Sequence, residues 1–254
     1  MAQGGGGRSD FFSREEISEV QDFPVLEWAS FIDDLFPYDL SLCLSYLCIS
    51  QGYDFFYFVQ QWPGSYCDTK RSCCYPATGK PATDFTIHGL WPQYNNNTYP
   101  SSCNQRSQFD ETKVSDLISR MEKSWPTFNC GKKSTNTKFW THEWTKHGTC
   151  SETVLDQHAY FAAALNIKDK VNLLEMLKNA GILPDGKFYK LEDMEEAIKL
   201  GTGHVPGIEC NHDASGNVQL YQIFLCVDAT GSNVIECPVV PIRKCDTLIQ
   251  FPVF

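Results

Sequence analysis

Twelve cysteines constrain the fold of this 254-residue chain more strongly than any other feature of its sequence. Structural zinc sites use close pairs of cysteine or histidine, whereas most of these cysteines stand singly and no CxxC occurs. The pattern favours a disulfide framework and an oxidising secretory route, and the sequon at 96–98 predicts a glycosylated Asn96. The twelve positions are Cys43, Cys48, Cys67, Cys73, Cys74, Cys103, Cys130, Cys150, Cys210, Cys226, Cys237 and Cys245.

Composition and charge exclude several classes of protein. Hydrophobic residues make up 42% and aromatic residues 13% of the chain, a composition that excludes disorder for most of it. The longest apolar stretch, at 40–49, is too short to cross a membrane, so a multi-span membrane protein is excluded. The formal net charge of −10 argues against bulk electrostatic binding of duplex nucleic acid, and any nucleic acid must be held locally.

Residues 1–52 differ from the rest of the chain. An apolar stretch at 40–50 resembles the hydrophobic region of a signal peptide, but it follows an acidic segment and not a basic one. We expect an atypical N-terminal extension at 1–52 and one catalytic domain at 53–254. The expected location is the secretory pathway, whether extracellular, vacuolar or derived from the endoplasmic reticulum. An altered N-terminus that compromises the signal is the alternative.

Hydrophobic patterns predict an α+β fold with a mostly antiparallel central sheet and packed helices. The aromatic run at 55–63, which ends in proline, predicts a buried central strand. Two later strands, at 218–226 and 234–239, are separated by turn residues and predict a hairpin. Periodic segments between these strands predict helices at about 110–123, 138–146, 156–165, 168–179 and 191–200.

The segment at 139–150, FWTHEWTKHGTC, concentrates groups that transfer protons. It lacks the second histidine of an HExxH zinc site, because Lys146 stands in that position. Helical spacing places Glu143, Lys146 and His147 on one face, with His142 at its edge. An acid, an amine and imidazoles suit proton transfer around an anionic transition state, which RNA transesterification requires without a metal. An ordinary polar role is expected for His158, His204 and His212.

Two segments, FTIHGLWP at 85–92 and FWTHEWTKHGTC at 139–150, resemble the paired active-site motifs of the ribonuclease T2 family in its plant S-like branch. The resemblance covers 53–254 and includes FFYFVQQWPGSYC at 55–67. It implies the α+β fold and cleavage of single-stranded RNA through 2′,3′-cyclic phosphates to 3′-phosphate ends, with no cofactor and no metal. DNA is not expected as a substrate, no membrane association is expected after processing, and a monomer is expected.

The resemblance also implies roles for individual residues. His147 takes the position of the general base on the ribose 2′-OH, and His88 that of the general acid on the departing 5′-oxygen. Glu143 and Lys146 would stabilise the pentacovalent phosphate, and His142 would bind the phosphate. The residues expected to line the base and ribose pockets are Gln61, Trp91, Thr127 and Phe139. The implied disulfides are Cys67–Cys73, Cys74–Cys130, Cys103–Cys150, Cys210–Cys245 and Cys226–Cys237, with Cys43 and Cys48 unassigned.

A catalytically inactive storage or defence protein built on the same fold is the main alternative to an enzyme. It would require the loss of a catalytic histidine, and His88 and His147 are both present. A protein that binds RNA without cutting it is a further alternative, which the acidic overall charge disfavours.

Overall fold

The computed structural model of this chain describes residues 52–131, 134–241 and 245–254. The signal-like stretch at 40–50, with Cys43 and Cys48, and all of the expected N-terminal extension except Gly52 lie outside the described residues. None of the described helices is both long enough and apolar enough to span a membrane.

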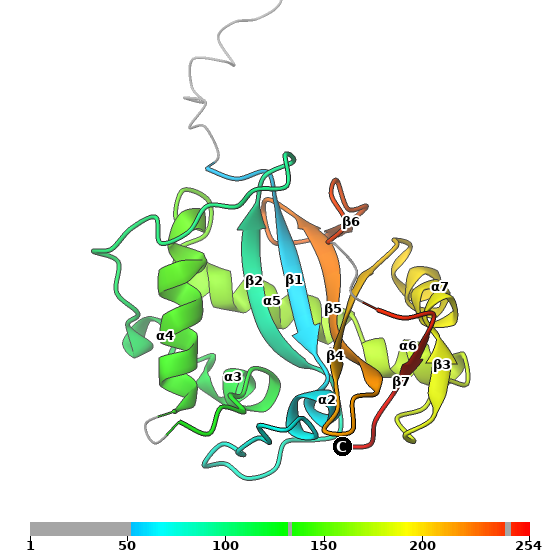
Figure 1. The fold of residues 1–254 in the computed structure, drawn as a ribbon. Helices are drawn as coiled ribbons and strands as arrows, with labels where there is room; N and C mark the ends of the chain where they lie inside the picture. The colour runs from blue at the N-terminus through cyan, green and yellow to red at the C-terminus, as the bar shows by residue number, and fades with distance from the viewer. Residues whose placement is uncertain (1–51, 132–133, 242–244) are drawn as a thin grey trace, which may run out of the picture. The chain divides into compact units, whose positions relative to one another are not determined.

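The described residues form a seven-stranded sheet (Figure 1). Strand β1 (Phe55–Gln61) lies between β2 (Thr86–Gln93) and β5 (Val218–Asp228) and is antiparallel to both. One pairing, between β5 and β7, is parallel, and the others are antiparallel. The α+β class with a mostly antiparallel sheet is therefore confirmed. The remaining strands are β3 (Phe188–Lys190), β4 (Gly207–His212), β6 (Val234–Ile235) and β7 (Leu248–Gln250).

Strand β1 is buried along its whole length, as its continuous aromatic sequence predicts. Alternate side chains point to opposite faces of the sheet. Phe56 and Phe58 join the main core, which also contains buried side chains of α3, α4 and α5. Phe55, Tyr57 and Val59 join a smaller cluster on the opposite face. Helices therefore cover the face of the sheet that carries Phe56 and Phe58, whereas the smaller cluster lies on the opposite face.

The helices differ from their predicted bounds at several places. Helix α5 continues to Lys170, past its predicted end at 165, and α2 lies where no helix was predicted. The segment predicted as one helix at 110–123 forms a 3-10 turn and then a short α-helix, α3. The segment predicted at 168–179 is divided, because the Asn172 side chain accepts a hydrogen bond from the Glu175 amide and caps a new helix. The helical elements are α2 (Pro63–Cys67), η1 (Glu111–Val114), α3 (Ile118–Ser124), α4 (Asn136–Lys146), η2 (Gly148–Ser151), α5 (Gln157–Lys170), α6 (Leu173–Asn179) and α7 (Leu191–Thr202).

Five disulfides connect the described residues, and their pairs are those that the resemblance implies. They link distant elements as well as neighbouring ones: Cys103–Cys150 ties the loop after β2 to η2, and Cys210–Cys245 ties β4 to the C-terminal segment. The other three pairs are Cys67–Cys73, Cys74–Cys130 and Cys226–Cys237.

Candidate active site

A β-bulge in β2 positions His88. Gly89 and Ile87 face consecutive residues of β1, so His88 is the extra residue in the pairing of the two strands. Ile87 packs in the main core, whereas the His88 ring lies 5.0 Å from the Trp91 ring, on the side of the smaller cluster. The bulge therefore turns the imidazole out of the core.

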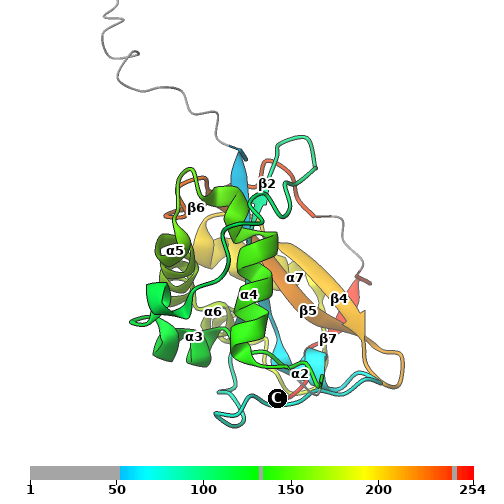
Figure 2. The same cartoon turned by 90° about the vertical axis from the view of Figure 1, so that its left-hand side faces the viewer.

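Helix α4 supplies the other polar side chains of the site. It begins where the Thr135 hydroxyl accepts a hydrogen bond from the Lys138 amide, and it ends at Lys146. His147 is its C-cap and not a residue of the helix interior, and η2 follows directly. Figure 2 shows α4 in front of the sheet, alongside β2. Strand β2, at the edge of the sheet, and helix α4 therefore lie beside each other.

These elements enclose a cavity of about 270 Å³, here called the catalytic cavity. It contains every residue predicted for proton transfer and phosphate binding, and Trp91 as well. The helical spacing of 143, 146 and 147 therefore does bring these side chains together with the bulged histidine. Its lining residues are His88, Trp91, Gln93, Tyr99, His142, Glu143, Lys146 and His147.

Glu143 is almost completely buried, with 1% of its surface exposed. The Trp91 indole Nε1 donates a hydrogen bond of 2.9 Å to its Oε2. Burial raises the pKa of Glu143 to about 8, although the Trp91 bond and the charge of Lys146 act in the opposite direction. The carboxyl is consequently neutral at acidic pH, where its proton can be donated to an anionic oxygen.

The imidazoles of the site favour their neutral forms. Burial lowers the pKa of His88 to about 4, and burial together with the charge of Lys146 lowers that of His147 to about 3. The pKa of His142 is lowered by the same two causes. The His147 ring also stacks on Trp91 at 5.2 Å, with 24° between the planes. A bound anion would raise the pKa of each imidazole.

Gln222, which is not predicted from the sequence, holds the ring of His88. Its side-chain Nε2 lies 2.6 Å from Nδ1 of His88, and the backbone carbonyl of His88 accepts a hydrogen bond from the Trp125 indole at 2.9 Å. Gln222 stands opposite Gln61 in the pairing of β5 with β1. A partner on Nδ1 leaves Nε2 of His88 as the nitrogen that is free to exchange a proton.

A second cavity of about 500 Å³, here called the base cavity, adjoins the first. His88 and His142 line both cavities. The base cavity contains three of the four residues expected around base and ribose, namely Gln61, Thr127 and Phe139. Trp91 does not line the base cavity; it lines the catalytic cavity. Tyr66 and Phe128 also line the base cavity and are not predicted from the sequence. Tyr66 belongs to α2, a helix that is not predicted either.

Comparison with known proteins identifies the family to which this chain belongs. The family model described as Ribonuclease T2 family matches residues 53–237. The chain belongs to the ribonuclease T2 family. It is 57% identical over 216 residues to extracellular ribonuclease LE of Solanum lycopersicum, covering 85% of this chain and 94% of that protein. It is 60% identical over 205 residues to ribonuclease 1 of Arabidopsis thaliana, covering 81% of this chain and 89% of that protein.

Structural comparison agrees with membership of the ribonuclease T2 family. The crystal structure of RNase NT in complex with 5′-AMP matches with a TM-score of 0.76 and 56% identity, covering 80% of this chain and 99% of that one. The histidines outside the two motifs lie away from both cavities of this T2 domain. Nε2 of His158 contacts Asp116 at 3.0 Å, and Nδ1 of His204 contacts Glu236 at 3.3 Å.

Proposed function

We propose that this chain, an endoribonuclease of the T2 family, cleaves single-stranded RNA by metal-free transesterification through 2′,3′-cyclic phosphates to 3′-phosphate ends. The observation that carries the proposal is the catalytic cavity, where His88 and His147 face one space together with Glu143 and Lys146. Two imidazoles on one cavity can act as base and acid on the same phosphodiester. The 2′-OH that this reaction requires restricts it to RNA.

In the first step His147 removes the proton of the ribose 2′-OH. The 2′-oxygen forms a bond to phosphorus, the bond from phosphorus to the 5′-oxygen breaks, and His88 gives a proton to that departing oxygen. The neutral carboxyl of Glu143 and the ammonium of Lys146 donate to the phosphorane oxygens, and His142 contacts the same phosphate. Donors fixed in place before the reaction stabilise the charge that develops in the transition state.

The second step reverses the roles of the two imidazoles. His88, now neutral, removes a proton from water, and the resulting oxygen attacks the cyclic phosphate. The bond from phosphorus to the 2′-oxygen breaks, and His147 returns a proton to that oxygen. The product carries a 3′-phosphate, and both histidines regain their starting protonation states.

The two cavities give the substrate a direction. His88, the acid on the departing 5′-oxygen, lines the base cavity, whereas His147 lines only the catalytic cavity. The leaving nucleoside therefore enters the base cavity, and the attacked ribose stays in the catalytic cavity. Phe139 offers an aromatic face to the leaving base, with polar contacts from Gln61 and Thr127.

The oxidised chain, incubated with single-stranded RNA in EDTA at pH 5, tests the reaction. We expect cyclic-phosphate and 3′-phosphate products by mass spectrometry, and no cleavage of a DNA of the same sequence. Intact RNA would contradict the proposal and favour an inactive storage or defence protein of this fold. Tight binding with intact RNA would indicate a protein that binds RNA without cleaving it.

The activity should depend on pH in a bell-shaped manner. The acid His88 must be protonated, so its lowered pKa, about 4, makes kcat/KM fall as the pH rises above that value. The base His147 must be neutral, so activity is lost as the pH falls through its pKa, about 3. The apparent values belong to the coupled group. Because the bound phosphate raises both pKa values, the kcat profile should lie at higher pH than the kcat/KM profile.

A variant without the charge of Lys146 tests whether that charge sets the pH range of the activity. That charge lowers the pKa of both His88 and His147, so Lys146→Met should move both limbs to higher pH while it lowers kcat. Initial rates measured from pH 3 to 8 with a short RNA would show the shift. A profile that is flat between pH 4 and 8 would contradict the assignment of acid and base.

The proposal includes a secretory origin, a monomeric state and a glycan on Asn96. Five disulfides support an oxidising compartment.

Asn96 is exposed, and its side-chain oxygen accepts hydrogen bonds from the amide and hydroxyl of Thr98. Intact mass before and after enzymatic deglycosylation measures the modification.

A further inference from the structure

A third cavity, of about 490 Å³, continues from the base cavity on the side away from the catalytic residues. We call it the Arg71 cavity. Tyr66, Phe128 and Asn129 line both it and the base cavity, so the three cavities form one continuous series. Its further lining includes Thr69, Arg71, Asn211 and Tyr221. None of these four residues contributes to the reaction described above.

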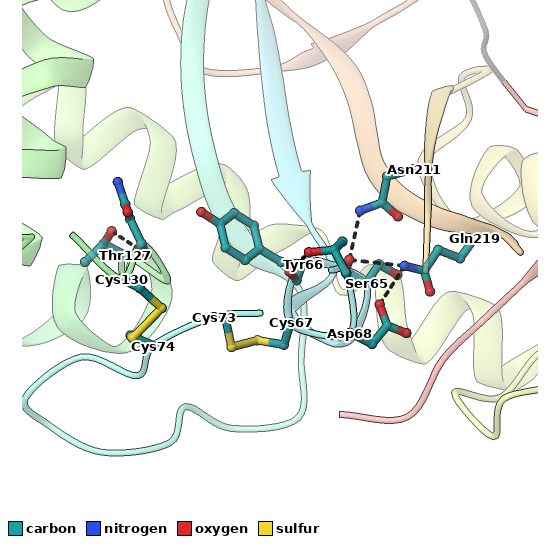
Figure 3. Close-up of a disulfide and its surroundings, with 12 residues drawn as sticks. Ser65, Tyr66, Cys67, Asp68, Cys73, Cys74, Thr127, Cys130, Asn211 and Gln219 are labelled. Atoms are coloured by element: carbon teal, nitrogen blue, oxygen red, sulfur yellow. Dashed lines mark hydrogen bonds between the residues drawn. A yellow bond between two sulfur atoms is a disulfide. The ribbon is translucent and has the colours of Figure 1, made fainter. Parts of the chain in front are cut away.

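The walls of the Arg71 cavity are held by covalent bonds on two sides. The loop that carries Arg71 is closed by the Cys67–Cys73 disulfide, and the next residue, Cys74, is bonded to Cys130 on the opposite wall. Figure 3 shows Tyr66 between the segment with Thr127 and Cys130 and the strand with Asn211. A cavity with fixed walls binds a ligand at a lower entropic cost.

Hydrogen bonds hold the base of the same loop against β4 and β5. Nδ2 of Asn211 donates to the Ser65 carbonyl at 2.8 Å, and Nε2 of Gln219 donates to the Asp68 carboxylate at 2.7 Å. Figure 3 shows both bonds below and beside Tyr66. Arg71 itself is exposed and forms no ion pair with a carboxylate among the described residues. Its guanidinium is therefore available to a ligand.

Charge within the Arg71 cavity is unevenly distributed. Burial raises the pKa of Tyr66, and the nearby guanidinium of Arg71 partly offsets that effect. Burial also raises the pKa of Tyr221 to about 12, with smaller contributions in the same direction from Tyr66 and then from the negative charge of Glu209. Among the described residues that line the cavity, Arg71 alone is charged, so an anion is favoured beside Arg71 and the tyrosines offer uncharged aromatic surface.

A phosphodiester beside Arg71 and a base beside the tyrosines match this distribution of charge. Arginine binds phosphate oxygens with paired N–H donors, and tyrosine rings stack on bases regardless of sequence. The ring centroids of Tyr66 and Tyr221 lie 6.4 Å apart, and Phe128 lines the same cavity. Because the leaving nucleoside occupies the base cavity, the group that reaches the Arg71 cavity is the next one on its 3′ side.

We infer that the Arg71 cavity is a third RNA subsite, in which Arg71 binds the phosphodiester on the 3′ side of the leaving nucleoside and Tyr66 and Tyr221 contact the nucleoside that follows. The inference rests on the proposed function, since the acid and base assignment sets the direction of the strand. It predicts that RNA longer than a dinucleotide gains affinity specifically from a 3′ extension.

Oligonucleotides with a single ribonucleotide test the subsite, because only the phosphodiester that follows a 2′-OH can be cleaved. The substrates are a dinucleotide, the same dinucleotide with one deoxynucleotide added on its 3′ side, and one with that addition on its 5′ side. For the unchanged chain the 3′ extension should raise kcat/KM by about 5- to 20-fold. Arg71→Ala should abolish most of that gain and leave dinucleotide cleavage unchanged.

Lys70→Ala is the matched control. Lys70 is the neighbouring exposed cation of the same loop but does not line the cavity, so its removal should preserve the gain from the 3′ extension. An equal gain in the Arg71→Ala variant, or no gain in the unchanged chain, would overturn the inference while dinucleotide cleavage upholds the proposed function. Failure of the unchanged chain to cleave any of the substrates would overturn both.

Discussion

Replacing His147 by phenylalanine is expected to lower kcat on single-stranded RNA by about 10²- to 10⁴-fold, the effect of losing a general base. The phenyl ring has nearly the shape of imidazole and can keep the stacking on Trp91. Nδ1 of His147 has no hydrogen-bond partner among the described residues, so the change leaves no protein group unpaired. Stability and RNA binding should therefore change much less than kcat.

Single-turnover rates with the His147→Phe chain, together with its thermal unfolding midpoint and its affinity for RNA, measure these effects separately. His158→Phe is the matched control. The His158 side chain hydrogen-bonds to Asp116, and it lines neither the catalytic cavity nor the base cavity. The kcat of this variant should stay within about twofold of the unchanged chain. Retention of activity in His147→Phe would require another base on the 2′-OH and would contradict the mechanism.

The parts of the site that sequence could predict are those defined by local spacing. Positions 143, 146 and 147 lie three and four residues apart, so the last turn of α4 and its C-cap bring them together without any distant contact. The buried strand β1 was predicted for a related reason, because a continuous aromatic run satisfies burial on both faces. Both predictions depend on only a few consecutive residues.

The parts that sequence could not predict depend on pairing between distant segments. The bulge at His88 exists only in the register of β2 against β1, which no local pattern encodes. The bond from Gln222 to His88 joins residues 134 positions apart. The sequence does predict two helices here, at 156–165 and 168–179, but it places the break too early: α5 continues to Lys170, and the side chain of Asn172 caps α6.

Gly89→Ala is expected to lower kcat by about 100-fold while the fold is retained. A Cβ atom at position 89 would overlap the indole nitrogen of Trp91 and the carboxylate of Glu143. The Glu143 oxygen ends a flexible side chain, whereas Nε1 and Cδ1 belong to the rigid Trp91 indole, so the whole ring must rotate for β2 to keep its pairing with β1. Movement of these two groups breaks the Trp91–Glu143 hydrogen bond and displaces the carboxyl that faces the phosphorane.

Gly52→Ala is the control for the backbone effect of replacing glycine, because the nearest atom to its added Cβ, the Cys150 carbonyl oxygen, lies 3.7 Å away. Combining Gly89→Ala with Glu143→Gln tests the cause. If the alanine acts by displacing Glu143, the double variant should lose little more activity than the more impaired single variant, whereas independent effects would multiply. Unchanged kcat in Gly89→Ala, measured on an RNA dinucleotide, would show that the bond from Trp91 to Glu143 does not orient the carboxyl during the reaction.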